Sequence, residues 1–140
     1  MNAAQNSTYW DSPSIFLLLE AWWELLRALV LVRLPSGRAW WLQDALSVQP
    51  GKKDRALTAA VSLAVDRASR HHIRPMRCLN RSLALLWMLR RRGIATALRV
   101  GCRRRGEALD FHAWVVDAEA RPLNGTLEHS AFLPLRGPDP

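Results

Sequence analysis

Two side chains in this sequence are suited to nucleophilic chemistry on a carbonyl carbon: the thiol of Cys78 and the imidazole of His112. Cys78 stands where a loop gives way to a helical pattern, and a helix N-terminus favours the attacking thiolate. Arg74, Arg77 and Arg81 surround it in sequence and favour the thiolate too. His112 opens an apolar strand, where an imidazole can take the thiol proton and return it to a leaving amine. The pair therefore suits nucleophilic attack by a thiol, with the imidazole as its base.

Neither residue decides the chemistry alone. A lone cysteine in a helix is usually an inert part of the core, and a lone histidine in a strand is usually a satisfied polar residue. Cys78 and His112 are separated by 34 positions, which constrains nothing without a fold. A third group is also needed to orient the imidazole.

The elements that must position the pair follow from apolar periodicity and turn residues. The pattern predicts helices over 14–34, 38–49, 54–71 and 78–92. Strands follow over 96–101 and 111–117, with a polar loop over 103–110 between them and a third strand starting at 121–123. Helices followed by antiparallel strands make an α+β layout.

Local signals define the ends of these helices. Ser12-Pro13 is a start signal for the first helix, and Asp54 can cap the third. Gly93 supplies a C-terminal stop for the helix that begins at Cys78.

The face to which His112 belongs follows from strand geometry. Alternate residues of a strand share a face, so His112, Trp114 and Val116 point the same way. We expect this to be the inner face, beside the helix that carries Cys78.

The net charge and the number of cysteines limit the partners and the cellular compartment that we expect. The net charge of +8, from 20 basic and 12 acidic residues, favours acidic partners, but no binding motif accompanies it to indicate nucleic acid. Two cysteines are too few for a disulfide framework, and no basic residue precedes the first apolar run as in a secretory signal. We therefore expect a cytoplasmic protein. The spacing of Cys and His does not match a zinc site, and we expect neither a metal nor a cofactor.

Arginine is dense from Arg74 to Arg105, where ten arginines occur without Asp or Glu. The stretch is either a surface for an acidic partner or a solvated basic face. Arg90-Arg91-Arg92 would end a helix, where cations are favoured in any case.

The apolar run over 14–34 approaches the length of a membrane span. Glu20, Glu24 and Arg27 fall within it, and a bilayer would penalise each of them. We expect a soluble helix buried on most sides, with an interfacial or partner-binding helix, peripheral to a membrane, as the alternative.

Three runs carry a family resemblance: Arg77-Cys78-Leu79-Asn80-Arg81-Ser82-Leu83-Ala84-Leu85, Leu89-Arg90-Arg91-Arg92-Gly93-Ile94 and His112-Ala113-Trp114-Val115. With them, residues 14–127 resemble the lasso-peptide biosynthesis B proteins, in particular their stand-alone leader peptidases (B2). The resemblance implies a transglutaminase-like fold related to papain, with N-terminal helices packed on a small antiparallel sheet. It also implies hydrolysis of one peptide bond, which removes the leader from a ribosomally made precursor peptide. The implied partners are that precursor, a leader-binding B1 protein and an ATP-dependent lasso cyclase.

The resemblance assigns site residues as well. Cys78 is the nucleophile, with its backbone N–H in the oxyanion hole, and His112 is the base. The third catalytic residue of the family is usually Asp, but Asn124 holds that place here, with Asp117 as the alternative. Arg74, Arg77, Arg81 and Trp114 are expected to bind the substrate or a partner.

This interpretation divides the chain into a flexible N-terminus (1–13), one peptidase domain (14–127) and an irregular tail (128–140). The domain would comprise a helical part (14–72) and the catalytic helix with its sheet (73–127). A different class of function also fits the basic charge: a non-catalytic adaptor that binds a precursor peptide, a partner protein or a membrane surface.

Overall fold

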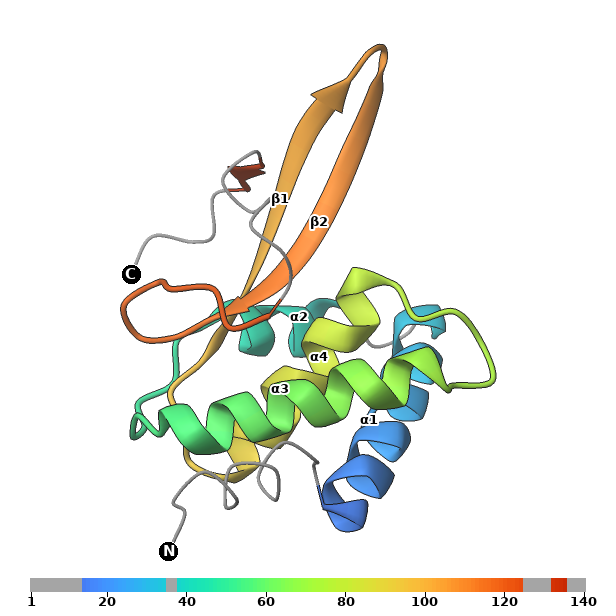
Figure 1. Cartoon of the computed structure of the whole chain (residues 1–140). Helices are drawn as coiled ribbons and strands as arrows, with labels where there is room; N and C mark the ends of the chain where they lie inside the picture. The colour runs from blue at the N-terminus through green and yellow to red at the C-terminus, as the bar shows by residue number, and fades with distance from the viewer. Residues whose placement is uncertain (1–13, 35–37, 125–131, 136–140) are drawn as a thin grey trace, which may run out of the picture.

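The computed structural model describes residues 14–34, 38–124 and 132–135. In these ranges four helices precede three strands, so the predicted α+β fold is confirmed (Figure 1). The elements are α1 (Ile15–Arg33), α2 (Arg38–Leu46), α3 (Arg55–Arg70), α4 (Cys78–Arg91), β1 (Ala97–Arg105), β2 (Ala108–Val116) and β3 (Leu133–Pro134).

Side-chain caps start two of the helices. Ser14 Oγ accepts from the N–H of Leu17 at the start of α1, and Asp54 Oδ1 accepts from the N–H of Leu57 at the start of α3. The cap predicted at Asp54 is therefore confirmed, whereas the start signal predicted at 12–13 lies outside the described residues. Gly93 follows α4 with a φ of 72°, the left-handed conformation expected of a C-terminal stop.

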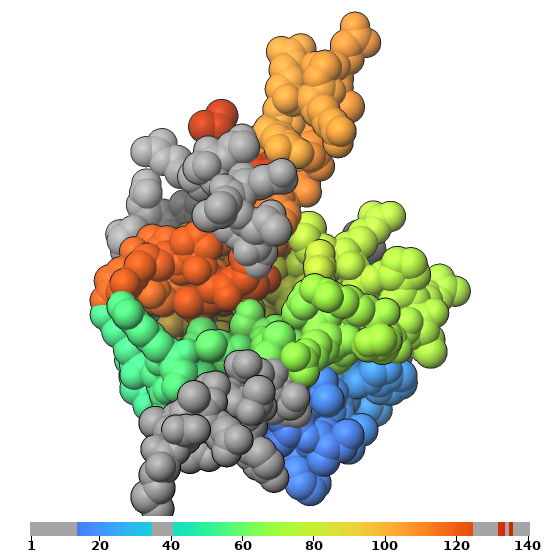
Figure 2. Space-filling model, in the orientation of Figure 1, coloured from blue at the N-terminus to red at the C-terminus, as the bar shows by residue number. Residues whose placement is uncertain are grey.

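The sheet is antiparallel with strand order β2-β1-β3. The polar loop predicted over 103–110 is wrong, because β1 and β2 pair across it as far as Arg105 and Ala108. A tight turn at Gly106 joins the strands, and its φ of 65° suits a residue without a side chain. The far half of this hairpin stands clear of the helices (Figures 1 and 2).

The third strand also differs from the prediction. Pro122 makes only an isolated bridge to Val116, flanked by hydrogen bonds from the N–H of Asp117 to the Arg121 carbonyl and from the N–H of Leu123 to the Val115 carbonyl. β3 pairs with β1 instead, within the stretch predicted as an irregular tail, and Phe132 beside it is buried. The interpretation of 128–140 as irregular is therefore wrong at these residues.

The core lies around α4, which contacts α1, α3 and β2. The largest fully buried apolar side chains of the core come from these elements and from β1: Leu25, Val61, Leu83, Leu85, Leu86, Met88, Leu89, Leu98 and Val115. The helix that begins at Cys78 is thus held on several sides, and its first residue is fixed in position.

Charged pairs join α1 to the C-terminal end of α4. Glu24 is 2% exposed and pairs with Arg91 and Arg27, and Glu20 pairs with Arg91 and Arg92. The hydrogen bond from Arg92 lowers the pKa of the Glu20 carboxyl. The acidic residues within the apolar run thus serve helix packing, and no described helix is long and apolar enough to cross a membrane.

Arg90 is bound within the fold as well. Its guanidinium donates to the carboxylate of Asp44 and to the carbonyl oxygens of Asp44, Ala45, Ser47 and Thr96. The three arginines that end α4 therefore link elements of the fold, although Arg91 is also half exposed to solvent.

The prediction that the first helix is buried on most sides is wrong for one of its faces. α1 buries Ala21, Glu24, Leu25 and Ala28 against the core. Its opposite face exposes a row of large apolar residues: Ile15, Phe16, Leu19, Trp23 and Val30.

Candidate active site

Cys78 is the first residue of α4 and is partly exposed. Unlike α1 and α3, this helix has no side-chain cap, because its N-cap residue is Arg77. Backbone N–H groups of the first turn, including that of Cys78, are therefore not taken by a cap and can face an anion. The sequence interpretation of Cys78 as a thiol at a helix start is consistent with this position.

His112 lies on β2, an edge strand of the described sheet. It shares a face with Trp114 as predicted, and the two rings stack with centroids 5.8 Å apart. The expectation that this is the inner face is wrong: Ala113 and Val115 pack into the core around α4, whereas Trp114 packs with Phe132 in a separate cluster. The His112 ring also lies 5.0 Å from the Phe132 ring. His112 nevertheless lines two cavities together with Cys78.

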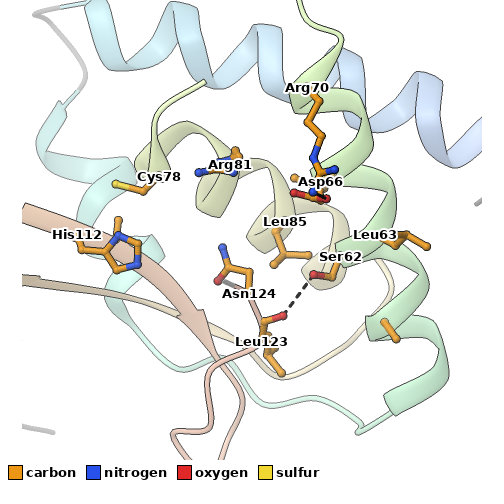
Figure 3. Close-up of a pocket in the computed structure, with 13 residues that line it drawn as sticks. Ser62, Leu63, Asp66, Arg70, Cys78, Arg81, Leu85, His112, Leu123 and Asn124 are labelled. Atoms are coloured by element: carbon orange, nitrogen blue, oxygen red, sulfur yellow. Dashed lines mark hydrogen bonds and ion pairs between the residues drawn. The ribbon is translucent and has the colours of Figure 1, made fainter. Parts of the chain in front are cut away.

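One cavity of about 740 Å³ brings Cys78 and His112 together (Figure 3). Figure 3 shows both toward one end, and Asp66 and Arg70, which form an ion pair of 2.7 Å, toward the other. Other polar lining residues are Ser62, Arg81 and Asn124. A second cavity of about 510 Å³ also includes Cys78, His112 and Ala113 in its lining. The thiol and the imidazole thus stand where two cavities meet.

Asn124 lines the first cavity with His112. Its Oδ1 accepts from the N–H of Val115 at 2.8 Å, and its Nδ2 donates to Ser82 Oγ at 3.1 Å. Because the Val115 N–H can only donate, the amide oxygen must face it. Ser82 Oγ in turn donates to the carbonyl of Ala113 at 3.0 Å. Asn124 therefore connects the loop after β2 to β2, which carries His112, and to α4, which carries Cys78.

Asp117, the alternative third residue, lies in the turn after β2. Its carboxylate accepts from the N–H groups of Glu119 and Arg121 and pairs with the Arg121 guanidinium at 3.2 Å. Asp117 lines neither cavity. Its contacts are those of a residue that holds a turn.

The predicted binding residues divide into three groups. Arg81 lines the first cavity, and its guanidinium forms no hydrogen bond or ion pair with the rest of the described chain. Arg74 and Arg77 are exposed in the loop before α4. Trp114 is 7% exposed and lines neither cavity. It packs against the His112 ring and leaves little surface for a substrate or partner.

Two residues near the site were missed in the sequence. Ser82 follows Cys78 by four positions, so helical spacing alone places both on one face of α4. No sequence pattern indicated a role for Phe132 at the site. It stands in a Pro-rich tail, and the pairing of β3 with β1 brings its ring to His112. Cys102 is a free thiol on β1 that lines neither cavity. Over the described residues, no three His, Cys, Asp or Glu side chains are placed to hold a metal.

One comparison with known proteins gives a match. No curated protein sequence and no solved structure matches the chain. The family model described as the transglutaminase-like superfamily matches residues 23–137, which include all the elements from α2 to β3. A partly exposed cysteine at a helix start and a histidine on an adjacent antiparallel strand lie within that match, and the chain belongs to the transglutaminase-like superfamily.

Proposed function

We propose that this protein is a cysteine peptidase that removes the leader from a lasso precursor peptide, in the manner of the stand-alone B2 peptidases. The observation that carries the proposal is that Cys78 and His112 line the same two cavities. Transglutaminase-like proteins are commonly thiol enzymes that hydrolyse peptides or transfer acyl groups. The three sequence runs that resemble those of the B proteins favour leader hydrolysis within that range.

In the proposed reaction, His112 takes the proton of the Cys78 thiol, and the sulfur attacks the carbonyl carbon of the scissile bond. The N–H of Cys78, at the uncapped start of α4, donates to the oxyanion. His112 then gives its proton to the leaving amine as the C–N bond breaks, which leaves a thioester on Cys78. Water, deprotonated by His112, attacks the thioester carbon. The C–S bond breaks, the sulfur regains its proton and the acid is released.

Asn124 is the proposed third member of the site. Its Oδ1 already accepts from the Val115 N–H and has a second lone pair for the imidazole N–H. A neutral amide orients the ring as a carboxylate would, but it gives less support to the imidazolium.

The proposed partners are a leader-binding B1 protein, the precursor peptide and the ATP-dependent cyclase that receives the freed core. Arg74, Arg77 and Arg81 would meet acidic groups of the leader or of its binding protein, since all three lie beside Cys78. We propose a cytoplasmic location. A peripheral position on a membrane is the alternative, because α1 exposes an apolar face.

The test is a mass-spectrometric cleavage assay with this protein, the B1 partner and a precursor from the neighbouring genes. We expect one cut, abolished by Cys78→Ala without loss of folding. Cys102→Ala is the matched control, because that thiol lines neither cavity and its loss should leave cleavage unchanged. Full cleavage by Cys78→Ala would refute the proposal.

The same assay separates two other functions. An acyl transferase would incorporate an added amine into the product, so hydrolysis alone under saturating amine counts against it. An adaptor would bind the precursor equally well with Cys78→Ala and would cut nothing.

A further inference from the structure

The second cavity has a lining unlike that of the first. Its volume is about 510 Å³, and it is formed by Val32, Trp41, Leu42, Leu79, Val100 and Phe111, together with the three residues that it shares with the first cavity. These six come from five elements, α1, α2, α4, β1 and β2. No charged side chain of the described chain contributes to it.

We propose that this cavity is the subsite for one bulky apolar side chain of the substrate, at a residue flanking the cleaved bond. The proposal deepens the proposed peptidase function and rests on it. A cavity of this size holds a leucine, phenylalanine or tryptophan side chain, and away from Cys78 and His112 its walls carry no charged side chain.

Because the cavity adjoins Cys78, its occupant should be a side chain of the substrate. Attack on a carbonyl carbon requires the sulfur to be about 3–3.5 Å away, so a bound peptide places the residues beside its scissile bond at the thiol. Cys78 and His112 belong to both linings, so a side chain that leaves the peptide on this side enters the apolar cavity.

The cavity walls also favour an apolar occupant. Phe111 is 57% exposed, so its ring offers apolar surface to a ligand that enters. The other cavity is lined by polar side chains, among them Asp66 and Arg81, and by apolar ones, among them Leu63 and Leu85. The apolar preference is therefore expected on the side of the bond that faces the second cavity, whereas the other side meets a mixed lining.

The first test needs no peptide cleavage. N-methylmaleimide and N-phenylmaleimide alkylate thiols by the same chemistry, and only the second carries an aromatic group. Rates at Cys78 and Cys102 are measured separately on the intact protein by peptide mass spectrometry, and Cys102 corrects for the intrinsic reactivity of each reagent. We expect the phenyl-to-methyl rate ratio at Cys78 to exceed that at Cys102 by about tenfold, from burial of the ring. Equal ratios at the two thiols in the wild-type protein would overturn the proposal.

A pair of variants on α1 tests the cavity itself. Val32→Phe adds bulk to the lining, and Val30→Phe adds the same bulk at a half-exposed position that lines neither cavity. We expect the phenyl preference at Cys78 to fall to the Cys102 value in Val32→Phe and to persist in Val30→Phe. The same loss in both variants, or in neither, would also overturn it.

Peptide cleavage then distinguishes the two proposals. If the phenyl preference is present and the precursor is not cut, the subsite stands and the peptidase function fails. If the precursor is cut, replacing each residue beside the cleaved bond by alanine should lower kcat/KM about tenfold or more at one position, and less so in Val32→Phe. A cut with no such position would remove the subsite and leave the peptidase.

Discussion

Asn124→Ala tests how the site is held together. In the wild-type protein, the carboxamide accepts from the N–H of Val115 at 2.8 Å and donates to Ser82 Oγ at 3.1 Å. Ser82 is fully buried, and its hydroxyl proton is used on the Ala113 carbonyl. The alanine side chain replaces neither bond, so the loop after β2, the strand with His112 and α4 lose their shared link.

The expected loss of stability follows from these bonds. Each hydrogen bond contributes about 0.5–1.5 kcal/mol, and the N–H of Val115, a buried residue, costs more when it is left without an acceptor. We expect Asn124→Ala to lower the free energy of unfolding by about 2–4 kcal/mol. Asn124→Asp keeps the acceptor for Val115 but places a carboxylate oxygen against Ser82, whose only proton is engaged. This variant should lose about 1–3 kcal/mol.

The rate of precursor cleavage should distinguish the role of Asn124 from that of Asp117. If Asn124 orients the imidazole, Asn124→Ala slows cleavage about 100-fold or more in protein that is still folded. Asp117→Ala is the matched control, because its carboxylate holds a turn and lines neither cavity. Urea unfolding at neutral pH measures stability, and mass spectrometry measures the rate below the unfolding transition.

Two results would refute this reasoning. Asn124→Ala as stable as the wild type would show that the bonds to Val115 and Ser82 do not brace the site. Equal slowing of cleavage by Asp117→Ala would assign the orienting role to the turn instead.

Three further predictions concern the frame around the site. Glu20→Gln should lower the free energy of unfolding by about 1–2 kcal/mol at neutral pH, since it removes an acceptor of Arg92. The hydrogen bond from Arg92 lowers the folded-state pKa of Glu20. The stability that it contributes is therefore present above the unfolded-state pKa of Glu20 and is lost as the pH falls through the folded-state pKa. Urea unfolding from neutral to acid pH should show the unfolding free energies of the wild type and Glu20→Gln converge. Gly101→Ala should cost about 1–3 kcal/mol and change tryptophan fluorescence, because the new Cβ would lie 2.9 Å from the Trp114 ring; unchanged unfolding would contradict the close packing. Ala120→Gly should raise the thermal midpoint by relieving a left-handed residue with a φ of 60°, a strain of about 1 kcal/mol; a lower midpoint would contradict this.

The helices and the position of the nucleophile were predictable because they depend on neighbours in sequence. Asp54 caps its own helix through the N–H three residues on, and Gly93 ends another through its own φ. Cys78 stands at the start of α4 as the apolar periodicity indicated. Each of these features is decided by hydrogen bonds and backbone angles within one turn, which a local pattern records.

The β hairpin shows where local reasoning failed. Residues 103–110 carry charges and a glycine, a composition typical of a loop. They form strand because β1 and β2 stand clear of the helices there, so neither face of the ladder has to be apolar. Arg103 pairs with Asp110 across it at 3.1 Å.

The sequence by itself determined the fold class and the two residues able to carry the chemistry, and tertiary structure decided what surrounds them. The face on which His112 lies depends on which side of the sheet the helices cover, and the alternation of residues is the same either way. The link from Asn124 to Ser82 spans 42 positions, and the lining of the apolar cavity comes from residues between Val32 and Ala113. Such contacts follow from how buried surfaces fit together over the whole chain, and no pattern of neighbouring residues records that fit.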